Sequence, residues 1–138
     1  MISNYSKKYK GGAKPTDAQE IIHALVTFRQ QTQIYHWQTK SYARHKASDE
    51  LLEKITDFTD KFMEIYFGKY GKVVISAPIT ITLNNLSDDE ATGYLDMMMT
   101  YFEDKLIPYL DAKDTDLINL RDEILGAIKQ TKYLYTLN

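Results

Sequence analysis

Residues 45–67 read HKASDELLEKITDFTDKFMEIYF, and this stretch decides the fold. Its apolar residues recur every three or four positions, which is the spacing of one face of an α-helix. The pattern continues to Gly68 and Gly71, residues of the type that ends helices. A long amphipathic helix is therefore predicted, with a buried stripe made of Leu51, Ile55, Phe58, Phe62 and Ile65.

A helix of about residues 17–39 is expected before this one. Thr16 and Gln19 have the spacing of a capping box, in which two side chains satisfy the free backbone groups at a helix start. A short break near Lys40 to Tyr42 separates the two helices. The apolar residues of the first helix again follow helical spacing. They are Ile21, Leu25, Phe28 and Tyr35.

Two more helices are expected after the long one. Ser87 and Glu90 form a second capping box, which opens a helix of about residues 88–110. Asp114 or Thr115 caps the last helix. The core stripe of that helix is Leu117, Leu120, Ile124 and Ile128.

The lengths of the connections predict how the four helices are joined. Fifteen residues, GKVVISAPITITLNN at 71–85, follow the long helix, whereas the other two connections are short. Such a segment reaches up to about 50 Å when extended, enough to span a helix of about 39 Å. One long crossover between two antiparallel hairpins predicts an all-α, ferritin-like four-helix bundle. Part of the crossover alternates like a strand, but Pro78 interrupts it and no second strand is available, so an extended strap is predicted, with at most one short helical or strand-like turn.

Composition limits the classes of function. The chain of 138 residues has no cysteine, which excludes disulfides, thiolate metal sites and cysteine nucleophiles. No segment approaches the roughly 20 apolar residues of a membrane helix, so we expect no membrane partner and a cytoplasmic location, which is the host cytoplasm if the chain is viral. Residues 1–15 are predicted to be a flexible basic tail, and residues 16–138 the bundle. The net charge of -2 is unevenly distributed. Lysines are the only charged residues of the tail, whereas the rest of the chain has 13 basic and 19 acidic residues, a net charge of -6.

Five residues are candidate metal ligands: His36, His45, Asp49, Asp60 and Glu64. With His45 taken as zero on a helical wheel, Asp49 lies at about 40°, Asp60 at about 60° and Glu64 at about 100°. The apolar stripe lies between about 200° and 280°, so these carboxylates point away from the core. In ordinary di-iron bundles the ligands include Glu-x-x-His pairs that point inward. Here the last two helices have no histidine, so a di-iron site inside the bundle is not expected. The alternative interpretation is an acidic face that is merely solvated.

The spacing of the carboxylates predicts a dimer. Asp49 and Asp60 are eleven residues apart, about 16 Å along a helix, which is too far for one metal cluster. If the long helix packs antiparallel against its copy across a two-fold axis, the His45 and Asp49 end of one chain meets the Asp60 and Glu64 end of the other. Two equivalent sites result. Imidazole with carboxylates suits Fe(II), and zinc or manganese would also fit.

These residues resemble the Dps family of mini-ferritins. The likeness covers the first two helices: His36 and Trp37 end the first, His45 opens the second with Asp49 four residues on, and Asp60 and Glu64 follow at the family's spacing. His45 follows His36 by nine positions, where the family commonly has twelve. That shorter connection is similar to the one in uncharacterised ferritin-like proteins of phages and large DNA viruses.

The resemblance implies a ferroxidase, which oxidises Fe(II) with peroxide or oxygen, stores the ferric mineral inside a homo-oligomer, usually a dodecamer, and limits oxidative stress. It also implies non-specific binding of DNA by a basic tail; the lysines concerned are Lys7, Lys8, Lys10 and Lys14. The competing hypothesis is a non-catalytic structural, assembly or DNA-packaging protein whose metal site is vestigial or structural. A plain solubilising tail is the alternative to DNA binding.

Overall fold

The computed structural model describes residues 18–138 and shows an all-helical chain. The prediction of an all-α protein with four main helices is confirmed, and the described residues contain no strand. The predicted tail of residues 1–15 and the capping residue Thr16 lie outside the described residues. The four helices are α2 (Gln19–Gln38), α3 (Tyr42–Tyr70), α4 (Asp88–Thr100) and α5 (Thr115–Leu134).

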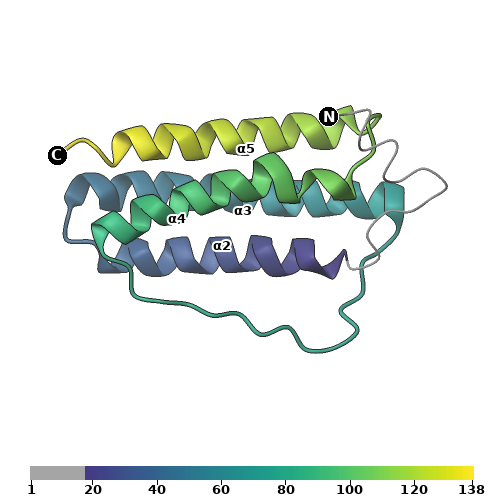
Figure 1. Cartoon of the computed structure of the whole chain (residues 1–138), viewed down its shortest axis with the longest axis horizontal. Coiled ribbons are helices and arrows are strands. Elements are labelled where there is room, and N and C mark those ends of the chain that lie inside the picture. Colours follow the sequence, from purple (N-terminus) through teal and green to yellow (C-terminus); the bar gives the residue numbers. More distant parts are fainter. Residues whose placement is uncertain (1–17) are drawn as a thin grey trace.

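The helices lie side by side, and the chain reverses direction twice through short connections (Figure 1). Helix α2 runs antiparallel to α3, and α4 runs antiparallel to α5. Between α3 and α4 the chain returns along the outside of α2 in an extended segment of residues 71–87, which we call the strap. Helix α3 packs against both α2 and α5. None of the helices in residues 18–138 is long and apolar enough to cross a membrane.

The core follows the predicted stripes. Ile65 and Leu120 are half-buried at the edge of the core, and the other stripe positions on α3 and α5 are buried. Each fully buried aliphatic or aromatic side chain stabilises the fold by roughly 1.5–3 kcal/mol. Aromatic rings join the layers, since Phe58 of α3 contacts Phe102 edge-on at a centroid distance of 5.3 Å. The face of α3 that carries Asp49, Asp60 and Glu64 is exposed, as predicted from the helical wheel.

Capping residues define the ends of α3 and α4. Ser87 and Glu90 form the predicted capping box of α4. Ser41 caps α3 by accepting a hydrogen bond from the Arg44 backbone N–H at 3.2 Å. Helix α3 ends at Gly71, whose φ of 86° and ψ of 164° are favourable only for glycine.

The third helix differs from its prediction. It was expected to continue to about residue 110, but α4 ends at Thr100 and is followed by a π-helical turn (Tyr101–Lys105) and a 3₁₀ turn (Ile107–Tyr109). Pro108 has no N–H to donate to the carbonyl of residue 104, and its ring would clash with that carbonyl in a regular helix. The helix widens into the π-helical turn instead, in which the Leu106 N–H donates to the Tyr101 carbonyl at 2.9 Å. The prediction of a regular helix to about residue 110 was therefore wrong.

Asp114 precedes α5, as predicted, but its side chain makes no capping bond. The carboxylate accepts hydrogen bonds from the Lys69 ammonium, the Tyr70 hydroxyl and the Asp111 backbone N–H. Burial by itself raises the pKa of Asp114, but these donors outweigh it and lower the pKa below its ordinary value. The cluster ties the end of α3 to the start of α5.

Candidate metal centre

His36 and His45 meet at the corner where α2 ends and α3 begins. Their imidazole rings stack with centroids 4.0 Å apart and planes inclined by 18°. The Nδ1 atom of His36 lies 2.9 Å from the His45 carbonyl oxygen, and the Nδ1 atom of His45 lies 2.9 Å from the His36 carbonyl oxygen. Each histidine therefore holds the backbone of the other, and the nine-residue spacing brings the two together.

The reciprocal bonds place a hydrogen on the Nδ1 atom of both rings. A carbonyl oxygen only accepts hydrogen bonds, so each Nδ1 must carry the hydrogen and donate it. In a neutral imidazole this leaves the Nε2 atom with its lone pair. Metal-binding histidines commonly donate their other ring N–H to a backbone carbonyl, which fixes the tautomer and the orientation of the ring. On each neutral ring, Nε2 is thus the nitrogen that carries a free lone pair.

Ser48 completes the inner side of the pair. This fully buried residue donates from Oγ to the His45 carbonyl at 3.1 Å, and its Oγ lies 3.3 Å from Nδ1 of His36. It fills the space behind both rings with a polar group that makes hydrogen bonds. No sequence motif points to this serine, although it lies one helical turn after His45.

Asp49 lies beside the pair on the solvent side. Its Oδ1 atom is 3.9 Å from Nε2 of His36, too long for a hydrogen bond. The His36 side chain is 12% exposed and that of Asp49 is 60% exposed, so the carboxylate borders the site from outside. Three of the five predicted ligands, His36, His45 and Asp49, are therefore neighbours within one chain.

Asp60 and Glu64 lie further along α3 and are exposed. Within residues 18–138 no group of three histidine or acidic side chains is arranged to hold a metal ion by itself. The site as predicted needs the Asp60 and Glu64 of a second copy. That contribution stays a prediction.

A second pair of residues lies directly behind the histidines. Tyr35 precedes His36 and Arg44 precedes His45, and the Arg44 guanidinium donates to the Tyr35 hydroxyl at 3.0 Å. Arg44 also donates to the Asp88 carbonyl at 2.7 Å and lies 4.7 Å from the centre of the Tyr135 ring. Arg44 therefore contacts residues of α2 and α4 and the end of α5 from the start of α3.

The Tyr35 hydroxyl is part of the same network, which we call the Arg44 network (Tyr35, Arg44, Asp88 and Tyr135). It donates to Asp88 Oδ1 at 2.5 Å. Burial and this bond to a carboxylate raise the pKa of Tyr35, so the phenol stays protonated and remains a donor at neutral pH. The network locks the ends of α2 and α3 that carry the two histidines.

Large aromatic side chains flank the site on the outside. Trp37 is 70% exposed and Tyr42 is 75% exposed. The Tyr42 ring lies 6.4 Å from that of His45 in a stacked orientation. Exposed tryptophan and tyrosine are enriched in protein interfaces, so this corner has the composition of a contact surface.

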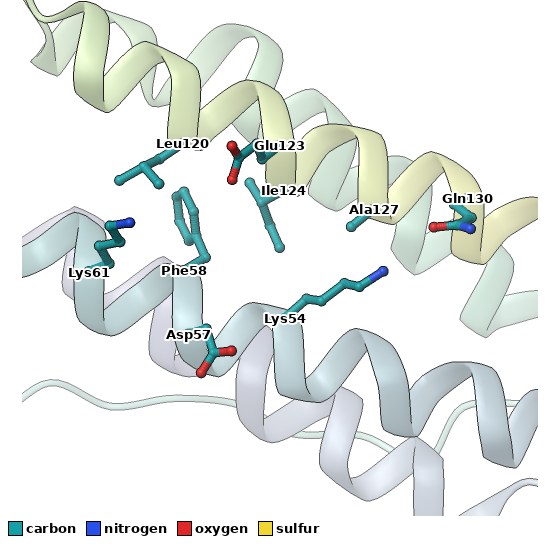
Figure 2. A pocket seen from close by; sticks show the side chains of 9 residues that line it. All are labelled: Lys54, Asp57, Phe58, Lys61, Leu120, Glu123, Ile124, Ala127 and Gln130. Carbon is teal, nitrogen blue, oxygen red and sulfur yellow. The ribbon is translucent and has the colours of Figure 1, made fainter.

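A groove of about 460 Å³ lies between α3 and α5, away from the histidine pair (Figure 2). Phe58 and Ile124 lie between the two helices, and the Lys54 side chain extends toward α5. Both signs of charge border the groove, so it favours neither an anion nor a cation. Its lining consists of Lys54, Asp57, Phe58, Lys61, Leu120, Glu123, Ile124, Ala127 and Gln130.

His23 does not take part in the metal centre. Its Nε2 atom bonds the Thr80 carbonyl oxygen at 2.8 Å, on the strap side of α2.

The structure thus defines a helical-bundle protein with a paired-histidine corner. The chain belongs to a family of unknown function (DUF5856), which matches residues 36–135 and so includes all five candidate ligands. It is also similar to the uncharacterized 14.6 kDa protein in the mobD-ri intergenic region of Enterobacteria phage T4, with 30% identity over 130 residues that cover 94% of this chain and 95% of that protein. No solved structure matches the chain.

Proposed function

We propose that this protein is a Dps-like, ferritin-like ferroxidase that oxidises and stores iron at sites shared between two subunits. The observation that carries the proposal is the histidine pair: both Nδ1 atoms donate to backbone carbonyls at 2.9 Å, so Nε2 is the ring nitrogen left for a metal on each neutral histidine.

The connectivity supports the ferritin-like assignment. Two antiparallel hairpins, α2 with α3 and α4 with α5, are joined by a strap that returns along the bundle (Figure 1). A single long crossover is the arrangement of ferritin-like bundles, whereas cytokine bundles have two. Ligands on the outer face of α3 fit a site between subunits better than one inside the bundle.

The second copy supplies what one chain lacks. Asp60 and Glu64 are exposed, one helical turn apart, on the same side of α3 as Asp49. Antiparallel pairing of α3 with its copy brings them to the His36 and His45 corner of the other chain. The exposed Trp37 and Tyr42 then become interface residues.

The residues divide the chemistry between them. Two Fe(II) ions are the substrate: each gives up one electron, and one hydrogen peroxide takes both electrons and two protons to become two waters. The imidazole Nε2 atoms of His36 and His45 bind and orient the ions, since Nδ1 is already engaged. The carboxylates of Asp49, Asp60 and Glu64 favour the more highly charged ferric product. Zinc or manganese fits the same donor set.

Iron oxidation measured on variants tests the proposal. Purified protein is mixed with Fe(II) and peroxide while ferric absorbance is followed, and His45→Ala is compared with His23→Ala. His23 is the matched control, because it is also a histidine with one bond to a backbone carbonyl but lies on the strap side of α2. We expect His45→Ala to lose at least about tenfold in rate and His23→Ala to keep the wild-type rate. Equal rates in wild type and His45→Ala would refute catalysis at this corner.

A second candidate function is a non-catalytic assembly or DNA-packaging protein with a structural or vestigial metal site. The reciprocal bonds of the histidine pair favour it, because they join α2 to α3 without any metal. Under this candidate, zinc raises the melting temperature of wild type, or has no effect, while Fe(II) is oxidised only at the background rate. DNA binding through Lys7, Lys8, Lys10 and Lys14, which lie outside the described residues, predicts a gel shift that salt abolishes.

A further inference from the structure

The outer face of α3 is acidic along most of its length. Four exposed carboxylates lie within about 60° of one another around the helix axis. They are Asp49, Glu53, Asp60 and Glu64. Pairing of α3 with its copy places them opposite the same carboxylates of the second copy, and like charges that face each other across an interface weaken association. The two proposed metal sites lie at the ends of this contact, so its centre needs positive groups supplied by the protein.

The proposed function, on which this inference rests, fixes which residues meet at the centre of the contact. In the shared site Asp49 lies near Asp60 of the second copy. Two antiparallel helices keep one register along the contact. Glu53, four residues after Asp49, therefore lies opposite Thr56 of the second copy, four residues before Asp60. Both positions are close to the two-fold axis, so a side chain beside Thr56 is placed to meet Glu53 of the other chain.

Arg29 of α2 lies beside Thr56. Its Nε atom donates to Thr56 Oγ1 at 3.2 Å, and Thr56 Oγ1 in turn donates to the Leu52 carbonyl at 2.9 Å. Arg29 and Glu53 are both exposed, and within residues 18–138 neither of them forms an ion pair. A guanidinium has five N–H donors. Arg29 therefore has further donors available for a carboxylate, at the place where the register brings Glu53 of a second copy.

We propose that Arg29 of each chain pairs with Glu53 of the other chain across the two-fold axis. The symmetry makes two equivalent ion pairs, one on each side of the axis. Arginine suits this position, because its planar guanidinium can bind a carboxylate through two parallel hydrogen bonds. The pairs also set the register, since a slip of one helical turn separates them and moves the carboxylates of the second copy away from the histidine pair. Arg29 is thus a positioning residue of the shared site and not a ligand.

Pairing within one chain is the competing arrangement. Glu53 precedes Thr56 by three residues, so it lies on the same side of α3 as the threonine that holds Arg29. An ion pair within one chain would stabilise the bundle and leave association unchanged. An ion pair between chains contributes to association, and only this arrangement depends on which two chains meet.

Mixing two charge-reversal variants distinguishes the arrangements. Arg29→Glu and Glu53→Arg are purified separately, and a dimer of either variant alone has like charges at both ion pairs. A dimer of one Arg29→Glu chain with one Glu53→Arg chain has opposite charges at both pairs again. If the pairing lay within one chain, mixing would restore nothing. Lys61→Glu is the matched control, because it reverses an exposed positive charge on the side of α3 that borders the groove toward α5.

Sedimentation of the metal-free proteins measures association. We expect the dimer dissociation constant to rise at least about tenfold for each variant alone, and to return to within about threefold of wild type in the equimolar mixture. Lys61→Glu should associate like wild type. Both substituted side chains are exposed, so the variants should unfold in urea at concentrations close to wild type. Wild-type association of either variant alone, or a mixture that associates no better than its components, would overturn the ion pairs.

Iron oxidation of the same samples separates this inference from the proposed function. With Fe(II) and peroxide, the rate should be low in each variant alone and should recover in the mixture, because the register of the shared site is restored. Recovery of association without any iron oxidation that depends on His45 would support the ion pairs and refute the ferroxidase. Oxidation that depends on His45, without recovery of association in the mixture, would overturn the ion pairs and leave the ferroxidase proposal intact.

Discussion

Replacing Arg44 should weaken metal binding at the proposed site without removing a proposed ligand. The guanidinium donates to the Tyr35 hydroxyl at 3.0 Å and to the Asp88 carbonyl at 2.7 Å, and it lies 4.7 Å from the Tyr135 ring centre. Tyr35 and Arg44 are the residues directly before His36 and His45. Loss of the guanidinium therefore frees the two helix ends whose separation sets the distance between the imidazoles.

The magnitude follows from the interactions that the guanidinium makes. Two hydrogen bonds from a charged donor contribute about 1.5 kcal/mol each at the low end of their range, and the cation–π contact adds about 0.5 kcal/mol. The ion pair of Arg44 with the Asp88 carboxylate is 3.9 Å long and that side chain is 50% exposed, so it adds little. Arg44→Ala should thus lower the free energy of unfolding by about 3–4 kcal/mol, and Arg44→Lys by about half as much, because an ammonium cannot reproduce the planar fork of donors.

Urea unfolding measures the stability, and calorimetric titration of the oligomer with Zn(II) measures the site. Asp114→Asn is the matched control, because it breaks a comparable polar cluster at the far end of α3. Loss of a residue that supports a ligand typically weakens metal binding about 10- to 100-fold, and we expect this for Arg44→Ala but not for Asp114→Asn. Wild-type zinc affinity in Arg44→Ala would show that the network stabilises the bundle without positioning the histidines.

Three further predictions concern stability. Asp114→Asn should cost about 1.5–3 kcal/mol at neutral pH, because the buried side chain loses its charge and with it the stronger hydrogen bonds from Lys69 and Tyr70. The Lys69 side chain is 43% exposed, so solvent limits the cost of its lost partner. Since the folded pKa of Asp114 is lowered, the difference from wild type should persist above about pH 4 and shrink as the pH falls through the folded pKa, as acid unfolding curves of both proteins would reveal. Gly71→Ala should destabilise by about 1–3 kcal/mol through backbone strain alone, since an added Cβ would meet nothing within 4 Å. Gly126→Ala, equally open but inside α5, should instead stabilise by up to about 1 kcal/mol in thermal unfolding.

The long helix was predictable because one period operates over its whole length. Leu51, Ile55, Phe58 and Phe62 are all buried, and the carboxylates opposite them are all exposed. The π-helical turn after Thr100 was not predicted, although Pro108 was visible in the sequence. A proline shows that a regular helix is interrupted, but whether the chain stops, kinks or widens depends on the packing of neighbouring residues such as the buried Phe102 and Leu106.

The candidate site was predictable in its residues and not in its geometry. Helical spacing identified His45, Asp49, Asp60 and Glu64 as one outward stripe, and His36 fell at the end of the preceding helix. The exchange of bonds between ring nitrogens and carbonyls depends on the path of the chain through residues 39–41, which periodicity does not describe. Ser48 and Arg44 carry no motif of their own, so only the folded chain shows that they support the histidines.

The short connection between α2 and α3 has a structural consequence that bears on function. With His45 nine positions after His36, each ring reaches the carbonyl of the other, and the rings stack at 4.0 Å. A longer connection would relax this constraint, because loop residues would then separate the two carbonyls. The short connection therefore restricts the corner and keeps a hydrogen on Nδ1 of both rings. If the corner binds metal, that arrangement lowers the cost of ordering the ligands; if it does not, the same bonds still close the hairpin. The iron assay on His45→Ala and His23→Ala decides between these two roles.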